Sequence, residues 1–464
     1  MRRRIQHVHF VGIGGIGMCG IAELLHTQGY RVSGSDLREG PTVEHLRQLG
    51  IEVQIGHDAA HLGEVDVCVY SSAVRPSNPE LIEAERRKIP VIPRAEMLAE
   101  VMRLKDGIAI GGSHGKTTTS SLITHVLHDA GLDPTAVIGG RVLLPDASPT
   151  TTRMGASDLL VAEADESDGS FLRLAPVMAV VTNIDAEHLD HYGSYDALEN
   201  AFVEFANRVP FWGLTVLCLD HPGVQAIVPR MTRRHITYGF ASQADLIASD
   251  AQPDGPGMRF DVRRRDEKLG TARIRLPGRH NVLNAMATIA VALDLEVSFD
   301  QAAAALDTFL GIERRFERKG ESRGVQVIDD YGHHPTEIRA TLAAAREIHD
   351  GRIVVAFQPH RFTRTRDLWE EFTAAFNDAD RLFLTEIYAA SEDAIPGIDA
   401  ARLVEAIRSH GHHDAEFVPD LDAVVERVVA EARAGDMVIT LGAGNISTLG
   451  RRILEGLDAK GGGA

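Results

Sequence analysis

Short runs with the composition of strands alternate with amphipathic stretches from the beginning of the chain. Residues 7–14, 31–36 and 65–74 have the length and spacing of strands, whereas residues 20–30 and 79–102 contain stretches with the spacing of helices. Glycine and proline separate these segments. The alternation predicts a parallel sheet with helices on its faces.

The same alternation returns twice further along the chain. A second unit opens at residues 106–131 with a strand, a glycine loop and a long helix, and its strands continue to residue 220. Residues 237–276 differ, because short runs alternate there with charges, which predicts antiparallel hairpins. A third unit alternates strands and helices from residue 325 onward. We therefore predict an α/β chain of three domains, over residues 1–98, 99–312 and 313–464.

Composition agrees with three domains and excludes several functions. The chain has 464 residues, with 48 Lys and Arg against 66 Asp and Glu, which gives a net charge of −18 and argues against a nucleic-acid partner. No stretch approaches the ~18–20 apolar residues of a membrane span, and the basic start is better explained as a strand and turn than as a secretion signal. Three widely spaced cysteines indicate a reducing compartment, so we expect a cytoplasmic protein. Monomer and homodimer both remain open.

A first glycine loop follows the first predicted strand and opens a helix. Gly12, Gly14 and Gly17 match the spacing G-x-G-x-x-G, with Gly15 inside it, and Asp36 ends the next strand. This pattern is typical of a loop that receives a diphosphate at a helix N-terminus, with the carboxylate bound to ribose hydroxyls. The alternative is a tight turn with close helix packing. A diphosphate does not by itself imply nicotinamide chemistry.

The second glycine loop, at residues 111–118, is the strongest local signal for a function. Backbone N–H groups of such a loop wrap phosphates, while Lys116 reaches the β- and γ-phosphates and Thr117 binds Mg²⁺. The standard pattern requires glycine at position 110, which is Ile110 here, so we expect a shorter or differently shaped loop. The predicted nucleotide-binding residues of this loop are Gly112, Ser113, His114, Gly115, Lys116, Thr117 and Thr118.

Two consecutive predicted strands of this unit end in polar residues that could bind Mg²⁺. Residues 163–168 contain four carboxylates, and residues 183–191 contain acidic residues and two histidines. Oxygen ligands at the carboxyl ends of strands, beside a phosphate loop, are the expected place for Mg²⁺. A solvated acidic loop is the alternative for either segment, and a single histidine such as His188 is more often structural.

Taken together, the chain resembles the Mur ligase family over nearly its whole length. Any one of eight segments is a modest signal, but all of them occur in order across the three predicted domains. The segments are residues 12–18, 112–119, 163–171, 182–192, 280–285, 313–316, 329–337 and 358–365. The resemblance implies a Rossmann-like N-terminal domain for a UDP-sugar, a central P-loop ATPase-like domain for ATP, and a Rossmann-like C-terminal domain that helps to bind an amino acid.

Within the family, the chain is similar to the branch that joins L-alanine to UDP-N-acetylmuramate. The likeness implies ATP, two Mg²⁺ ions and an acyl-phosphate intermediate in the cytoplasmic synthesis of cell-wall precursors. It implies that Thr117, Glu166 and His188 bind metal and that Lys116, His188, Arg361 and Arg364 act in catalysis. It further implies nucleotide contacts for Asn281, Asn284, Arg315 and Asp330, and substrate contacts for Gly12, Gly14, Gly15, Gly17, Asp36, Ser71, Tyr331 and His333.

One departure from sister ligases is informative. Several of them carry a lysine about fourteen residues after the metal-site histidine, and this lysine becomes carbamylated and bridges Mg²⁺. That place is Phe202 here, and no lysine lies between Lys116 and Lys268. We therefore predict that no carbamyl-lysine operates, as is common in the L-alanine-adding branch.

Three alternative functions remain at this point. A recycling ligase that attaches a whole tripeptide to the same UDP-sugar would differ mainly in its third domain. An oxidoreductase built on Gly12–Gly17 and Asp36 would leave the second glycine loop unexplained. A nucleotide-binding regulatory protein without catalysis would not need Lys116, Glu166 and His188.

Overall fold

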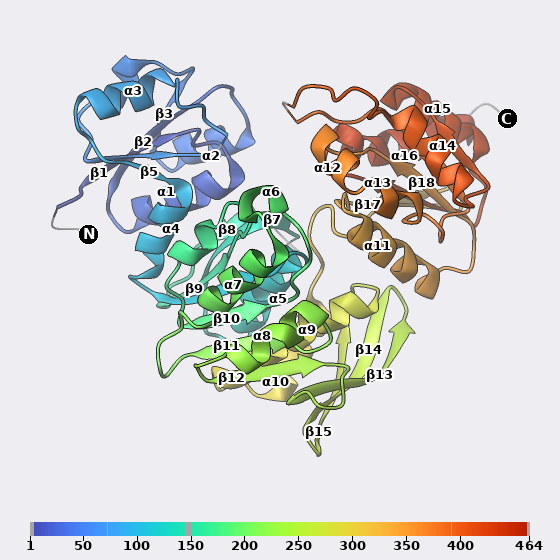
Figure 1. Cartoon of the computed structure of the whole chain (residues 1–464), viewed down its shortest axis with the longest axis horizontal. Coiled ribbons are helices and arrows are strands. Elements are labelled where there is room, and N and C mark those ends of the chain that lie inside the picture. Colours follow the sequence, from blue (N-terminus) through green and yellow to red (C-terminus); the bar gives the residue numbers. More distant parts are fainter. Residues whose placement is uncertain (1–3, 72, 144–149, 391, 462–464) are drawn as a thin grey trace. The chain divides into compact units, whose positions relative to one another are not determined.

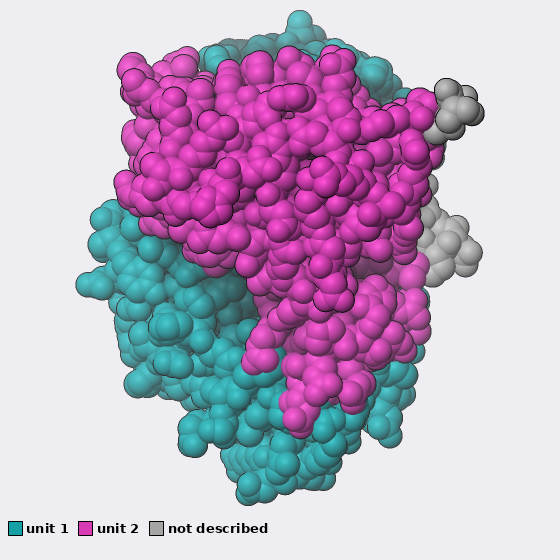
Figure 2. Space-filling model, turned by 90° about the vertical axis from the view of Figure 1, so that its right-hand side faces the viewer, with its two compact units in different colours: residues 1–249, 261–272, 283–306 teal, residues 250–260, 273–282, 307–464 magenta. Residues whose placement is uncertain are grey.

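A computed structural model describes residues 4–71, 73–143, 150–390 and 392–461. The chain divides into two compact units, which Figure 2 colours separately: residues 1–249, 261–272 and 283–306 form unit 1, and residues 250–260, 273–282 and 307–464 form unit 2. Three sheets make up the fold (Figure 1). In the part of the chain described, no helix combines the length and apolar character needed to cross a membrane.

The first sheet is parallel and has the strand order β3-β2-β1-β4-β5. Its strands are β1 (His7–Val11), β2 (Arg31–Asp36), β3 (Glu52–Ile55), β4 (Val67–Tyr70) and β5 (Val91–Pro93), and its helices are α1 (Ile16–Thr27), α2 (Pro41–Gln48), α3 (Pro79–Arg86) and α4 (Arg94–Met102). Proline at the first position of α2 and α3 suits a helix start, where no N–H partner is needed. The predicted boundary at 98/99 falls within α4 and remains a prediction.

The second sheet has ten strands in the order β15-β14-β13-β12-β11-β10-β6-β9-β7-β8. The strands are β6 (Asp106–Gly111), β7 (Thr135–Val142), β8 (Thr150–Arg153), β9 (Leu159–Glu163), β10 (Met178–Val181), β11 (Leu214–Cys218), β12 (His235–Gly239), β13 (Leu246–Asp254), β14 (Gly257–Arg264) and β15 (Glu267–Ile274). The helices are α5 (Lys116–Asp129), α6 (Leu189–Tyr192), α7 (Tyr195–Ala206), α8 (Pro222–Ile227), α9 (Arg279–Asp294) and α10 (Phe299–Thr308).

The hairpins expected over residues 237–276 are confirmed only in part. β13, β14 and β15 are neighbours joined by two-residue links, as hairpins require. β12, however, pairs in parallel with β11, and β13 pairs in parallel with β12. The parallel part of the sheet therefore extends through β12 to β13, further than the charge pattern indicated.

The third sheet has the order β16-β17-β21-β18-β19-β20, and only β16 runs antiparallel to its neighbour. Its strands are β16 (Glu317–Ser322), β17 (Val325–Asp330), β18 (Ile353–Phe357), β19 (Arg381–Leu384), β20 (Ala415–Phe417) and β21 (Met437–Leu441). Its helices are α11 (Pro335–Ile348), α12 (Phe362–Asp367), α13 (Trp369–Thr373), α14 (Ala400–Ser409), α15 (Leu421–Glu431) and α16 (Leu449–Gly461). The predicted three-domain α/β fold is confirmed, while the boundary at 312/313 remains a prediction.

Candidate active site

The second glycine loop joins β6 to α5 and leaves no room for larger residues. Gly112 and Gly115 have φ values of +129° and +81°, which disfavour L side chains. A Cβ on Gly112 would collide with Thr182 Oγ1, and one on Gly115 would lie 2.7 Å from Asn284 Oδ1. The two glycines therefore let the backbone pass close to Thr182 and Asn284, and the loop leads into the start of α5, whose first N–H groups have no intrahelical partner.

The segment after β10 holds this loop in place. His114 N–H donates to Asn183 Oδ1 at 2.7 Å, and Asn183 Nδ2 donates back to the His114 carbonyl at 3.0 Å. Thr182 Oγ1 donates to the same carbonyl at 2.6 Å, and Asp185 N–H donates to Ser113 Oγ at 2.9 Å. Sequence reasoning singled out the segment for metal binding, but not Thr182, Asn183 and Asp185 for shaping the loop, because that role depends on two strands lying side by side.

Asp185 extends this support through two histidines. His114 Nε2 lies 2.9 Å from Asp185 Oδ2, and His221 Nε2 lies 3.1 Å from Oδ1. These hydrogen bonds hold the pKa of Asp185 far below its usual range. The contact with Asp185 thereby orients the His114 ring and fixes its position in the loop.

Lys116 folds back over the loop to a carboxylate. Its Nζ donates to the Gly112 carbonyl at 2.6 Å, to the Ser113 carbonyl at 3.1 Å and to Glu166 Oε2 at 2.8 Å. Burial opposes the charge on the lysine, but Glu166 outweighs it and raises the pKa of Lys116. Burial, which Lys116 only partly offsets, raises the pKa of Glu166 to about 7. A charged lysine is thus held where a phosphate would lie.

Thr117 and Lys116 contact two different glutamates, Glu163 and Glu166. Thr117 Oγ1 donates to Glu163 Oε2 at 3.2 Å, and Glu163 Oε1 accepts the N–H of Gly139 at 2.6 Å. Glu166 contacts Lys116 and not Thr117 in this structure, and its shared metal site with Thr117 stays a prediction. Glu163 was part of the acidic run noted in the sequence, and its place at the last residue of β9 was the available signal.

Glu166, Glu187 and His188 form a group whose ligand atoms all lie within 4.8 Å of one another. His188 has φ +56°, an uncommon left-handed conformation for a non-glycine residue, and its Nε2 lies 3.6 Å from Glu187 Oε2. Two carboxylates and an imidazole suit a divalent cation, and Mg²⁺ in particular prefers the oxygens. The residues present therefore fit the expected metal.

Asn281 and Asn284 both belong to α9, and both are buried. Thr119 Oγ1 donates to Asn284 Oδ1 at 3.1 Å, which places Asn284 against the first turn of α5, beside Thr118. Asn281 Nδ2 donates to the Pro277 carbonyl at 2.7 Å, at the start of its own helix. The structure thus brings Asn284 to the phosphate loop.

The first glycine loop is shaped by the end of β2. The N–H groups of Gly12 and Ile13 both donate to the Ser35 carbonyl, at 2.9 and 3.0 Å, and Gly14 N–H donates to Asp36 Oδ2 at 2.8 Å. Asp36 therefore stabilises the turn, and the ribose contact expected of it stays a prediction. Ser71 N–H donates to the Val11 carbonyl at 3.3 Å, beside the same loop.

The packing of this loop supports both interpretations, a diphosphate site and a tight turn with close helix packing. A Cβ on Gly14 would lie 2.9 Å from Asp36 Oδ2, and one on Gly17 would lie 2.7 Å from Arg94 Nη1. Gly15 N–H donates to the Gly12 carbonyl at 3.2 Å, which closes a tight turn. Close packing explains Gly14 and Gly17, while the helix N-terminus at Ile16 remains a suitable place for a diphosphate.

The third sheet gathers its predicted residues where parallel strands end, the edge at which open α/β sheets bind ligands. Asp330 ends β17, and its carboxylate accepts the N–H groups of Phe316 and Gly332, both at 2.8 Å, and the hydroxyl of Thr341 at 3.1 Å. Burial raises the pKa of Asp330. The side chain thereby holds the turn that carries Arg315.

A row of rings lies along this edge. The centroids of Tyr331 and His333 are 5.2 Å apart, those of His333 and His360 are 5.9 Å apart, and those of His360 and Tyr388 are 5.5 Å apart with the rings nearly parallel. Burial, aided by nearby cations, lowers the pKa of both His333 and His360 to about 4. The two imidazoles are therefore neutral at physiological pH.

Arginines flank this row. The Arg315 guanidinium lies 5.0 Å from the centre of the Tyr331 ring, and Arg364 Nη1 donates to the His360 carbonyl at 3.3 Å. Arg361 has φ +72° and precedes α12, with its N–H bonded to the Tyr388 carbonyl at 2.8 Å. Neutral rings between cations form a surface suited to a carboxylate.

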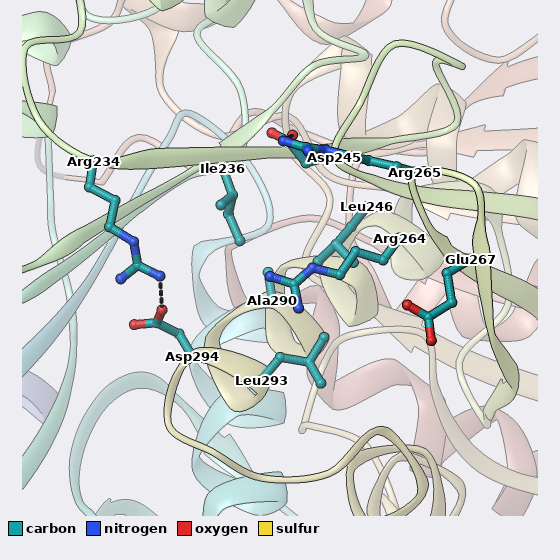
Figure 3. Close-up of a pocket in the computed structure, with 10 residues that line it drawn as sticks. All are labelled: Arg234, Ile236, Asp245, Leu246, Arg264, Arg265, Glu267, Ala290, Leu293 and Asp294. Carbon is teal, nitrogen blue, oxygen red and sulfur yellow. Dashed lines mark hydrogen bonds and ion pairs between the residues drawn. The ribbon is translucent and has the colours of Figure 1, made fainter.

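A cavity of about 560 Å³ lies elsewhere, between β12–β15 and the last turns of α9 (Figure 3). Four apolar and six charged residues line it, and Arg234 forms an ion pair with Asp294 at 2.5 Å on one side. None of the residues predicted for the active site lines it. We assign this cavity no part in the reaction.

The comparisons with known proteins agree with this geometry. The chain is 58% identical over 462 residues to the UDP-N-acetylmuramate–L-alanine ligase of Sorangium cellulosum, covering 99% of this chain and 98% of that protein. It is 54% identical over 453 residues to the ligase of the same name from Myxococcus xanthus, covering 98% and 95%. The relatives are thus similar along nearly their entire length.

Solved structures show the same fold. The UDP-N-acetylmuramate-alanine ligase of Thermotoga maritima matches with a TM-score of 0.82 and 28% identity, covering 98% of this chain and 99% of that one. A murein peptide ligase from Psychrobacter arcticus matches with a TM-score of 0.70 and 26% identity, covering 97% and 98%.

Three family models match in the order of the three sheets. Residues 7–106 match the catalytic domain of the Mur ligase family, residues 110–292 match the Mur ligase middle domain, and residues 314–444 match the glutamate ligase domain of Mur ligases. With the full-length relatives, these matches establish that the chain belongs to the Mur ligase family.

Proposed function

We propose that the protein is a UDP-N-acetylmuramate–L-alanine ligase that uses ATP to join L-alanine to the lactyl carboxylate of the UDP-sugar. The observation that carries the proposal is the phosphate loop, in which half-buried Lys116 faces buried Glu166 beside Glu187 and His188. This is the arrangement needed for phosphoryl transfer, and the full-length relatives of 54–58% identity supply the substrate names. We further propose that it acts in the cytoplasm.

The reaction follows from the chemistry of a carboxylate. A carboxylate oxygen attacks the γ-phosphorus of ATP, the bond to the β,γ-bridging oxygen breaks, and ADP leaves behind an acyl phosphate. The amine of L-alanine then attacks the acyl carbon, and phosphate leaves as the amide forms and the amine loses a proton. Because every group except the amine is anionic, positioned positive charge and orientation account for much of the acceleration.

The residues of the phosphate loop bind and orient the nucleotide. The backbone N–H groups at the start of α5 receive phosphate oxygens, and Lys116 exchanges its contact with Glu166 for the γ-phosphate. Thr117, Glu166 and His188 would hold Mg²⁺, with Glu163 and Glu187 beside them, and two ions are part of the proposal. Bound Mg²⁺ supplies charge neutralisation between the triphosphate and the incoming carboxylate.

The other two sheets bind the remaining substrates. Gly12, Gly14, Gly15 and Gly17, with Asp36 and Ser71, form the diphosphate end of the UDP-sugar site. On the third sheet, Arg361 and Arg364 bind carboxylate, and Tyr331 and His333 form the wall beside it. Arg315 and Asp330 are proposed for the nucleotide, with Asp330 acting through the turn that it holds.

One assay separates this proposal from its nearest alternative. The protein is incubated with UDP-N-acetylmuramate and ATP, together with L-alanine, L-serine, glycine or the cell-wall tripeptide, and ADP release is followed. We expect the fastest release with L-alanine. ADP release with the tripeptide, but with none of the single amino acids, would instead indicate a murein peptide ligase. In a separate incubation with a nicotinamide cofactor, turnover of that cofactor without ADP release would indicate an oxidoreductase.

A further inference from the structure

Phe211 and Trp212 form an exposed aromatic pair in the turn between α7 and β11. Their exposed fractions are 83% and 55%, and Phe211 is the most exposed large apolar residue in the described ranges. A backbone hydrogen bond from Gly213 N–H to the Pro210 carbonyl, at 2.9 Å, closes the turn. Adjacent aromatic side chains in solvent usually mark a surface that binds something.

A second segment rich in arginine is attached to this turn. Asn207 Nδ2 donates to the Arg230 carbonyl at 3.1 Å, and Thr232 N–H donates to Asn207 Oδ1 at 2.8 Å. Thr215 N–H, one residue into β11, donates to the Arg234 carbonyl at 3.0 Å. Residues 207–213 and 228–235 therefore form one continuous surface, here called the aromatic–arginine surface.

The aromatic–arginine surface is positive in a chain of net charge −18. Its two segments contain four arginines, Arg208, Arg230, Arg233 and Arg234, and no Asp or Glu. Arg208 pairs with Glu204 and Arg234 with Asp294, both at 2.5 Å. Within the described residues, Arg230 contacts the Asn200 side-chain oxygen and Arg233 the Asn207 carbonyl, so neither charge is neutralised by a carboxylate.

This surface lies at the edge of the second sheet opposite to the phosphate loop. It is formed where β11 and β12 begin, whereas the loop at Gly112–Gly115 follows the end of β6 in the same run of parallel strands. A partner bound there would leave the nucleotide loop open. The surface is therefore unexplained by the ligase reaction.

We propose that the aromatic–arginine surface binds peripherally to an anionic phospholipid membrane. A side chain exposed as far as that of Phe211 projects into solvent, which suits insertion between headgroups better than enclosure of a peptide in a groove. Aromatic rings, tryptophan above all, favour the headgroup level of a bilayer, and arginines beside them attract anionic lipid. The charge is complementary only to an acidic partner.

The test uses the full-length protein and vesicles of phosphatidylcholine, alone or with phosphatidylglycerol. Trp369, the partly buried first residue of α13, is the other of the two tryptophans, so a Trp369→Phe variant leaves Trp212 as the only tryptophan reporter. We expect a blue shift of its fluorescence and co-sedimentation with the anionic vesicles only, both weakened by salt. Equal binding to neutral vesicles, or no shift with either, would overturn the proposal.

Two double charge reversals are compared, one within the aromatic–arginine surface and one away from it as the matched control. Arg230→Glu with Arg233→Glu is expected to weaken binding to anionic vesicles at least about tenfold, and Phe211→Ser with Trp212→Ser to abolish it. Arg86→Glu with Arg87→Glu, the same charge change at two exposed positions where α3 ends, should leave it unaltered. All variants should keep ADP release in solution. A concentration-dependent dimer that the Phe211→Ser, Trp212→Ser variant loses, without vesicle binding, would show that a second copy is the partner instead.

Discussion

Lys116 Nζ lies 2.8 Å from Glu166 Oε2, and the glutamate is almost fully buried. The carboxylate thus neutralises the lysine that we propose for phosphate binding. On that proposal, ATP replaces one anion by another at the same ammonium group, and the released carboxylate becomes available to a cation. The proposal therefore couples the binding of the nucleotide and of Mg²⁺ through this pair.

The first prediction concerns Glu166 and Glu163. Glu166→Gln should raise the Mg²⁺ concentration for half-maximal ADP release about 10–100-fold or more, because it removes a metal ligand. Glu163→Gln should raise it less, because this carboxylate contacts Thr117 and the Gly139 N–H. Titrating activity with Mg²⁺ at saturating ATP measures both, and Glu85→Gln, exposed on α3, is the control. Equal effects at Glu163 and Glu166 would contradict the assignment, and so would full ligase activity of Lys116→Ala.

The second prediction concerns a buried polar network under the first glycine loop. Glu80 is fully buried and accepts hydrogen bonds from His9 at 2.7 Å, His57 at 2.8 Å and Ser35 Oγ at 2.7 Å. Glu80→Ala leaves these partners unsatisfied and should lower the free energy of unfolding by about 3 kcal/mol. Urea unfolding measures this, with exposed Glu85→Ala as the matched control on the same helix.

The same network should affect substrate binding. The carbonyl of Ser35 holds the N–H groups of Gly12 and Ile13, so a loosened Ser35 loosens the loop. We expect the milder Glu80→Gln to raise KM for the UDP-sugar several-fold with kcat little changed. A fall in kcat at unchanged KM would show that the network serves the chemistry and not the sugar site.

The third prediction follows from the two neutral histidines of the third sheet. The pKa of His333 and of His360 is lowered to about 4, whereas the unfolded chain binds these protons near pH 6.5. The unfolded state therefore gains protons first as the pH falls, and stability is lost between about pH 6.5 and 4. Because both rings retain some exposure, we expect a loss of about 1–2 kcal/mol for the pair.

Fluorescence of Trp369 reports this transition in a Trp212→Phe background, since Trp369 packs beside the third sheet. His333→Asn with His360→Asn should flatten the dependence of unfolding on pH, and exposed His413→Asn should not. A profile that stays equally steep in the double variant would show that other groups cause the acid sensitivity.

The fourth prediction concerns Phe202. Its ring is fully buried, and its centroid lies 5.2 Å from that of Phe171 in the described structure. ADP release should therefore not respond to added bicarbonate, because no lysine is present there to be carbamylated. Phe202→Lys should abolish folding, since it buries an unpaired ammonium group. Activation by bicarbonate, or a carbamylated lysine detected by mass spectrometry, would contradict this.

Much of the fold and the loop chemistry could be predicted because both depend on local sequence. Strand–glycine–helix order identified both loops and Lys116. Polar residues at strand ends marked the segments that contain Glu166 and His188, and the family resemblance singled out these two residues. Glu163, Thr182 and Asp185 were missed as positioning residues, because their contacts cross between strands that are distant in sequence. The extension of the parallel sheet through β12 was missed for a similar reason.

The sequence by itself determined the α/β class, the order of the loops and the family, since periodicity, glycine spacing and charged side chains are properties of neighbours along the chain. Only the tertiary structure decided that Asp36 caps the Gly14 turn, that Asp330 holds Phe316 and Gly332, and that Lys116 rests on Glu166. Each of these partners is chosen by distance in space. Burial then sets the protonation of His333, His360 and Glu166, because desolvation depends on everything packed around a group.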